Sequence, residues 1–264
     1  MRALIPALPV AIGAAAYARR VQTLKPRAPA ARVQAWFWIG IAVLLVALVT
    51  PDGRFSDHMV QHLLLGDVAP LCIVLGLTGS VLRPLLVAPG IGRLRVLAHP
   101  LVALPLWAVD LIVWHLAGPY QAALRHDTLH AVEHLCFFGA GALMWAAVVE
   151  PLPGPAWFGN GWKAVYTLVV RALGMLVANV FIWGGHAFYA YYGSVSDQRT
   201  GGLIMFSEGG IVTLIVFGFL FMDWTREAEQ RQARIDAGLP PRPRPARARA
   251  RSSRSPATRG RHAG

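Results

Sequence analysis

Residues 57–78 read DHMVQHLLLGDVAPLCIVLGLT, so that two histidines, His58 and His62, stand directly before a long apolar run. Residues four apart lie on the same face of a helix, about 6 Å from each other. Two imidazoles at that spacing can therefore bind one metal ion, and the apolar run that follows is typical of a helix in lipid. We expect the rest of the chain to be a membrane scaffold that holds this stretch.

A second stretch also places closely spaced histidines before an apolar run. His126, His130 and His134, with Glu133 among them, again precede an apolar run. The alternative for any single histidine is a hydrogen-bonded residue at the wet end of a helix bundle, and one histidine alone would favour it. Two matching sets favour a shared metal site instead.

The composition indicates a membrane protein. Of the 264 residues, 55% are hydrophobic and 14% are charged, whereas soluble domains carry about 25% charged residues. About 20 apolar residues cross a bilayer as a helix, and the chain has room for six or seven such runs. The two cysteines, Cys72 and Cys136, are far apart and form no CxxC motif, so neither a disulfide framework nor a thiolate metal site is indicated.

These features predict an all-α fold, a polytopic membrane helix bundle of about seven transmembrane helices. The bundle is expected over residues 1–225 and a basic cytoplasmic tail, mostly disordered, over residues 226–264. From about residue 238 the tail consists of Pro, Arg, Ala and Ser, with too few apolar residues to fold. The expected spans are residues 4–18, 33–50, 58–78, 101–116, 128–149, 162–183 and 202–224.

Basic linkers follow the first and third spans and the basic tail follows the seventh, which places the N-terminus outside and the tail in the cytoplasm. Histidines from several spans then lie at the outer side. We expect His58, His62, His130 and His134 to approach each other there and to bind a metal ion in an exposed position. The further candidate ligands are His115, His126 and His186.

Imidazoles without thiolates suit copper, zinc, iron or nickel. Met59 and Met205 are expected on the same side, and thioethers favour Cu(I), although two methionines are more often packing residues. Carboxylates commonly accept a hydrogen bond from a metal-binding histidine and so orient it. For this orienting role we expect Asp57, Glu133, Asp197 and Glu208.

Ionisable residues inside apolar runs usually face a partner or a cavity. Arg171 and Asp110 each lie about 8 or 9 residues from the cytoplasmic ends of their spans, roughly 12–14 Å deep at 1.5 Å per residue. We therefore expect an ion pair between them, with Asp67 as the alternative partner. We interpret this pair as structural rather than as part of a proton path.

Several segments resemble, in order and spacing, the CtaG-type cytochrome c oxidase assembly factors. They are residues 57–65, Ala69-Pro70 and Leu75-Gly76, then residues 114–116 before Pro119-Tyr120, residues 129–134 with Met144-Trp145, and residues 196–198 with 201–205. The resemblance spans residues 4–224, and it departs from the family pattern at residues 206–208 and in the Arg-rich tail.

The resemblance implies a multi-pass protein of the bacterial cell (inner) membrane that is needed to make active haem–copper cytochrome c oxidase. The role it implies is copper insertion, with copper as the bound metal. It also implies oxidase subunits and membrane lipid as partners, and neither nucleic-acid binding nor enzymatic activity.

Two other functions stay open at this point. Histidine pairs on facing helices can bind haem axially, as in an electron-transfer protein, but the histidines here crowd one side of the membrane. A metal transporter would need polar residues along a continuous path, and Asp67, Asp110 and Arg171 are the residues that populate the middle.

Overall fold

The computed structural model describes residues 4–87 and 91–238, and all regular structure in these ranges is helical. The expected all-α class is therefore confirmed for the described part of the chain. The longer elements are α1 (Leu4–Leu24), α2 (Ala31–Val49), α3 (Phe55–Leu63), α4 (Ala69–Gly76), α6 (Pro100–His115), α8 (Asp127–Val149), α9 (Asn160–Trp183) and α10 (Val195–Asp236). Short elements connect them: η1 (Lys25–Arg27), η2 (Leu64–Val68), α5 (Gly79–Val87), η3 (Ile91–Ala98) and α7 (Ala117–Arg125).

The chain divides into two compact units, Met1–Asp223 and Trp224–Gly264. Helix α10 continues past the expected end of the bundle to Asp236, so the first part of the expected tail is helical. The sequence there is rich in Glu, Gln, Arg and Ala, which are good helix formers, and Glu227 lies 3.5 Å from Arg231 one turn later. The expected disorder of the tail concerns residues 239–264, which lie outside the described residues.

Five helices of the described chain are long and apolar enough to cross a membrane. They are α2, the continuous rod from α3 to α4, α8, α9 and α10. The pair α6–α7, bent by 71°, makes a sixth if it is counted as one span. The expected count of seven is not reached by this criterion, since the expected first span lies in α1, which is not among these helices.

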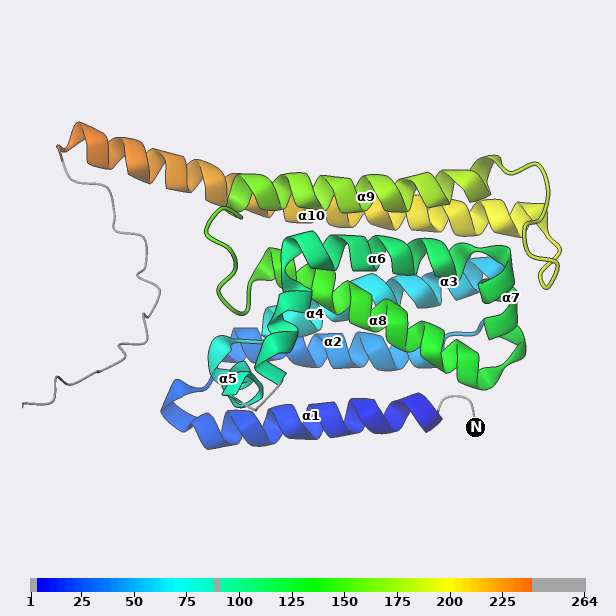
Figure 1. Ribbon diagram of the computed structural model, residues 1–264, viewed down its shortest axis with the longest axis horizontal. Coiled ribbons are helices and arrows are strands. Elements are labelled where there is room, and N and C mark those ends of the chain that lie inside the picture. The colour runs from blue at the N-terminus through cyan, green and yellow to red at the C-terminus, as the bar shows by residue number, and fades with distance from the viewer. Residues whose placement is uncertain (1–3, 88–90, 239–264) are drawn as a thin grey trace, which may run out of the picture. The chain divides into compact units, whose positions relative to one another are not determined.

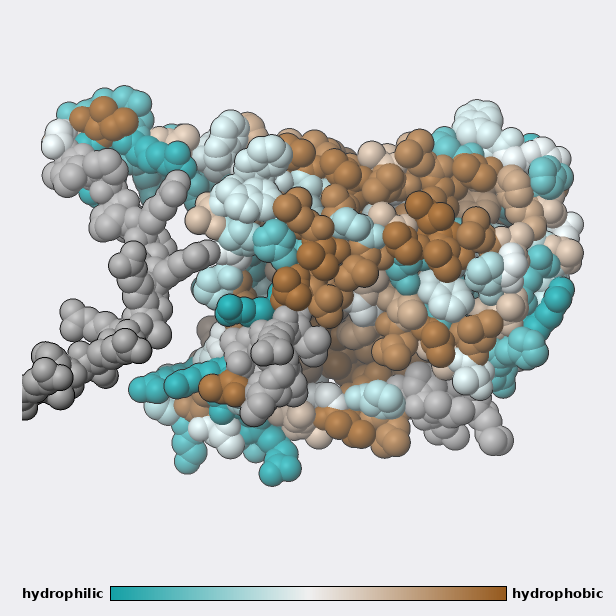
Figure 2. Space-filling view, in the orientation of Figure 1, coloured by the Kyte–Doolittle hydropathy of each residue, from teal (hydrophilic) through white to brown (hydrophobic). Residues whose placement is uncertain are grey.

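Helices of the first unit run side by side along one direction (Figure 1). Helices α3 and α8 both begin at the end of this unit where α7 and the α9–α10 connection also lie (Figure 1). Hydrophobic side chains cover the middle of the face shown in Figure 2, and hydrophilic ones gather toward its ends. This distribution fits a helix bundle that crosses a bilayer with two polar ends.

A π-helical turn, η2, joins α3 to α4. Pro70 has no N–H to donate within the helix, and the Ala69 N–H instead reaches back to the carbonyl of Leu64, five residues earlier. Next to this turn α8 comes very close, because a Cβ placed on Gly141 would overlap the carbonyl oxygen of Gly66. The close crossing of α3–α4 with α8 brings the histidines of both helices to one place.

Candidate metal centre

Helix α3 carries the first histidine pair. The rings of His58 and His62 lie on one face with centroids 4.1 Å apart, as their spacing predicts. The start of this helix is fixed by Asp197 of α10, whose carboxylate accepts hydrogen bonds from the Phe55 N–H at 2.7 Å and the Ser56 hydroxyl at 2.5 Å. Asp197 therefore caps α3, and the expected role of orienting a histidine is wrong for this residue.

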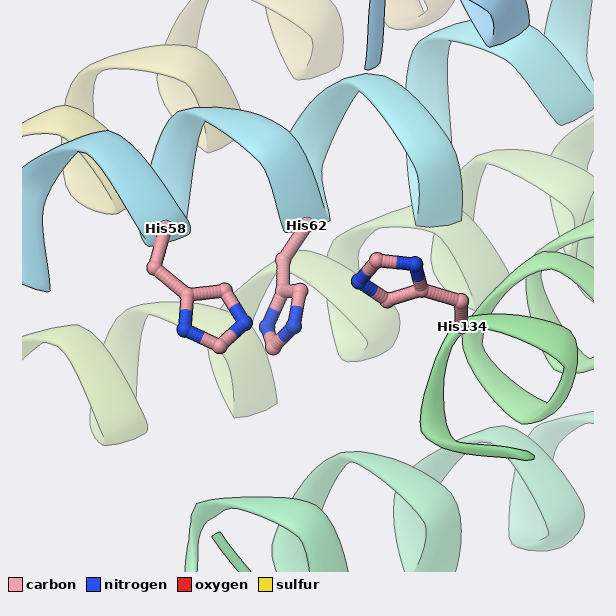
Figure 3. Close-up of side chains that lie close together, drawn as sticks. All are labelled: His58, His62 and His134. Carbon is pink, nitrogen blue, oxygen red and sulfur yellow. The ribbon is translucent and has the colours of Figure 1, made fainter. Parts of the chain in front are cut away.

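Helix α8 carries the second pair, His130 and His134, with ring centroids 4.2 Å apart. Across the helix interface the His58 and His130 centroids are 5.2 Å apart, and those of His62 and His134 are 5.9 Å apart. Figure 3 shows the rings of His58 and His62 hanging from α3 toward the space that His134 enters from α8. The structure thus brings all four expected ligands together.

Two overlapping sets of donor atoms meet the geometric requirement for a metal ion. One set is His58, His62 and His134, the other is His58, His130 and Glu133, and within each set the donor atoms lie within 4.8 Å of one another. A four-coordinate ion with bonds of about 2 Å places its ligand atoms about 3.3 Å apart. Side-chain rotations that move each donor atom by about 1 Å would let either set bind one ion.

Two tyrosine hydroxyls contact one ring nitrogen of His58. Its Nδ1 lies 2.9 Å from the Tyr192 hydroxyl and 3.1 Å from that of Tyr120. The Tyr192 hydroxyl also lies 3.0 Å from the Asp52 carbonyl oxygen. Nε2 is therefore the His58 nitrogen that is left for a metal ion.

Several buried polar atoms at this point have no hydrogen-bond partner among the described residues. They are Nε2 of His58, both ring nitrogens of His62, Nε2 of His134 and both carboxylate oxygens of Glu133. The side chains of His58 and Glu133 are 0% exposed. Leaving one such buried group unsatisfied costs about 1–3 kcal/mol, so a cluster of them indicates a site that is completed by a bound ligand.

Glu133 lies between the two histidine pairs. Its Oε1 is 3.8 Å from Nε2 of His62 and its Oε2 is 3.9 Å from Nε2 of His130. This position suits either of two roles, a direct ligand or a negative charge that balances a metal ion bound by the imidazoles. Glu133 is the one expected orienting carboxylate that the structure places beside the cluster.

The expectation of an exposed site is wrong, since the four histidines are buried, with residue exposures from 0% for His58 to 9% for His130 and His134. The first turn of α3 packs against α7 and against the tyrosines of the α9–α10 connection, which cover His58. An ion would therefore reach this centre only when a covering segment moves.

Three other expected residues lie away from the cluster. His126 precedes α8 and is exposed, and His186 is exposed beside Phe188 in the α9–α10 connection. Asp57 points outward and accepts two hydrogen bonds from Arg54, at 2.9 and 3.1 Å, which raise the pKa of the Arg54 guanidinium. None of the three belongs to the donor sets found among the described residues.

The buried ion pair forms with the alternative partner. Arg171 of α9 makes a two-pronged contact with Asp67, which also accepts a hydrogen bond from the Trp145 indole at 2.6 Å. The preferred pairing of Arg171 with Asp110 is wrong, because equal depth says nothing about the direction in which each side chain leaves its helix. Glu208 also lies beside this ion pair, 3.8 Å from Arg171. It does not have the expected role of orienting a histidine.

A cavity of about 70 Å³ lies between the histidine cluster and this ion pair. His62 and His115 line it together with Asp67, Asp110 and Glu208. No pattern in the sequence indicated this cavity. The tyrosine contacts of His58 were not expected either, although the closely spaced tyrosines at positions 189, 191 and 192, just before the last span, could have indicated them.

Comparison with known proteins gives one match. A family model described as cytochrome c oxidase caa3 assembly factor (Caa3_CtaG) matches residues 14–227. Searches of curated proteins and of solved structures found no match. The family match covers every histidine, tyrosine and carboxylate of the cluster and its surroundings.

Proposed function

The chain belongs to the family of cytochrome c oxidase caa3 assembly factors, and from this membership and the geometry of its histidine cluster we propose that it binds copper and delivers it to the oxidase during assembly. It acts as a binding protein rather than an enzyme. Its partners are the oxidase subunits and the surrounding lipid of a bacterial inner membrane, with the histidine end outward.

The observation that carries this proposal is the buried group of metal-capable atoms without partners. Three histidines and one glutamate offer such atoms from two helices that approach closely. A purely structural histidine cluster would satisfy its nitrogens with hydrogen bonds. Imidazole donors without thiolates suit copper or zinc, and the copper requirement of a haem–copper oxidase favours copper.

A haem-bearing function is less well supported. The four rings lie within a few ångströms of one another, with centroids 4.1–5.9 Å apart. A macrocycle needs a wide flat slot between two axial histidines, whereas the cavity beside these rings has a volume of about 70 Å³. The absorbance spectrum of the purified protein tests this directly, since bound haem gives an intense visible band.

Replacing His58, His62 and His134 together by alanine tests the metal site. We expect this triple variant to lose copper, because it removes every histidine of the first set and also His58, which the second set shares. Oxidase activity should then fall while the oxidase polypeptides are still made, and added copper should restore part of it. Metal analysis of the purified protein and oxidase activity in a deletion strain are the measurements.

The matched control is His126→Ala with His186→Ala, which removes two exposed histidines outside the cluster. This variant should bind copper and support the oxidase as the unchanged protein does. If the His58→Ala, His62→Ala, His134→Ala variant binds copper and supports normal oxidase activity, the proposal is wrong and the histidines are structural.

A further inference from the structure

The cavity below the histidine cluster has the features of a second ion position. Its volume of about 70 Å³ is well above the ~10–15 Å³ of cavity volume that one water molecule needs. His62 borders it, is 5% exposed, and has no hydrogen-bond partner on either ring nitrogen within the described chain. The imidazole of His62 therefore borders both the histidine cluster and the cavity.

His115 supplies a second imidazole to the cavity in the form that binds metals. Its Nδ1 lies 2.7 Å from the carbonyl oxygen of Leu111, and a carbonyl can only accept, so Nδ1 carries the hydrogen. The neutral ring then has its lone pair on Nε2. This Nε2 is buried and has no partner among the residues that the structure describes.

Thioethers complete the donor set. Met59 of α3, Met175 of α9 and Met205 of α10 all line the cavity. Met59 is 0% exposed and Met205 is 9% exposed, so these sulfur atoms are shielded from competing water. Thioether and imidazole together select Cu(I) over Zn(II) and harder ions.

The charges around the cavity favour a cation. Three carboxylates line it, those of Asp67, Asp110 and Glu208, against the single guanidinium of Arg171. Asp67 is satisfied by Arg171 and Trp145, whereas Oε1 of Glu208 is buried without a hydrogen-bond partner in the described part of the chain. Arg171 is balanced by Asp67, so the oxygen atoms of Asp110 and Glu208 can face a cation with no second Lys or Arg among the described lining residues to repel it.

We propose that this cavity is a second binding position for a cuprous ion, reached from the histidine cluster through His62. The inference rests on the proposed function, since it takes the cluster as the first position. An ion that passes between the positions exchanges His58 and His134 for His115 and the methionine sulfurs, and keeps His62 during the step. When both positions are filled, His62 stays with the cluster, and His115 and the methionine sulfurs hold the second ion. The step exchanges ligands on one ion, with no electron transfer.

The test is the number of ions bound by the purified, metal-free protein in detergent. Anaerobic titration against a chromophoric Cu(I) chelator should give two Cu(I) per chain, and equilibrium dialysis should give one Zn(II). Met59→Leu, Met175→Leu and Met205→Leu together should leave one Cu(I) and still one Zn(II), because leucine keeps the volume but removes the sulfur. His58→Ala with His134→Ala should bind one Cu(I) and no Zn(II).

Two controls check that the sulfur effect is local. Met144→Leu changes a buried methionine of the core that does not line the cavity, and it should leave two Cu(I). Cys72→Ala with Cys136→Ala removes both thiols and should also leave two. One Cu(I) in the unchanged protein, or two in the variant with all three methionines replaced by leucine, overturns the second position and leaves the first intact. No copper in any form overturns both.

Discussion

At the scale of single residues, the partners of each histidine decide what it can do. His58 and His115 both have their Nδ1 occupied, the first by Tyr192 and the second by the Leu111 carbonyl. Their Nε2 atoms are buried and have no hydrogen-bond partner among the described residues. His62, with neither nitrogen hydrogen-bonded in the described chain, is the residue that lies at both donor positions.

The buried pair of Arg171 and Asp67 gives a prediction at this scale. Arg171→Leu should lower the free energy of unfolding by about 3–5 kcal/mol, because it leaves Asp67 as a bare carboxylate in the interior. Adding Asp67→Leu should recover part of this loss, whereas adding Asp110→Leu should not. Thermal unfolding in detergent measures all three variants. Equal recovery with Asp110→Leu would contradict the pairing seen here.

At the scale of elements, the crossing of α3–α4 with α8 decides whether the histidines meet. Gly66 and Gly141 let the two backbones approach, and the π-helical turn before Pro70 lies at the same height. A side chain at the crossing would push the helices apart. The metal centre thus depends on residues that carry no ligand atom.

Gly141→Ala tests this crossing. The new Cβ would overlap the backbone carbonyl of Gly66, and overpacking of this kind typically costs about 1–3 kcal/mol. We expect a lower unfolding temperature and weaker copper binding, since the two histidine pairs separate.

Gly139→Ala is the control on the same helix, because a Cβ there meets nothing within 4 Å. Alanine favours a helix over glycine by about 1 kcal/mol, so this variant should be as stable as the unchanged protein or more so. Similar unfolding temperatures and copper affinities for the two variants would show that the close crossing does not hold the centre together.

At the scale of the whole molecule, all residues of both donor positions lie in the first unit, Met1–Asp223. The family match also ends near that boundary, at residue 227. No described residue of the second unit belongs to either position.

Removal of residues 239–264 should leave copper stoichiometry and oxidase assembly unchanged, because the ligands and the matched region are kept. The measurement is oxidase activity of a deletion strain that makes the shortened chain, with the abundance of that chain checked in membranes. A loss of oxidase activity at normal abundance would show that this basic segment has a specific role, such as binding anionic lipid.

The sequence by itself determined the class of the protein, most span positions and four histidines of the centre. Hydropathy and the four-residue spacing of His58 and His62 are local properties, and a helix converts them directly into a span and a shared face. Because these signals are local, the sequence did not predict some of the short elements. The π-helical turn and α7 depend on how neighbouring helices pack, which no local pattern encodes.

The tertiary structure alone decided which distant residues meet. Equal depth favoured Asp110 for Arg171, but the direction of each side chain around its helix axis selected Asp67. Proximity to the outer end favoured Asp57 and Asp197 as orienting groups, yet one pairs with Arg54 and the other caps α3. The cavity, and the contacts of His58 with Tyr120 and Tyr192, follow from side chains that meet between different elements. Such contacts depend on the rotation and separation of packed helices, which a one-dimensional pattern leaves free.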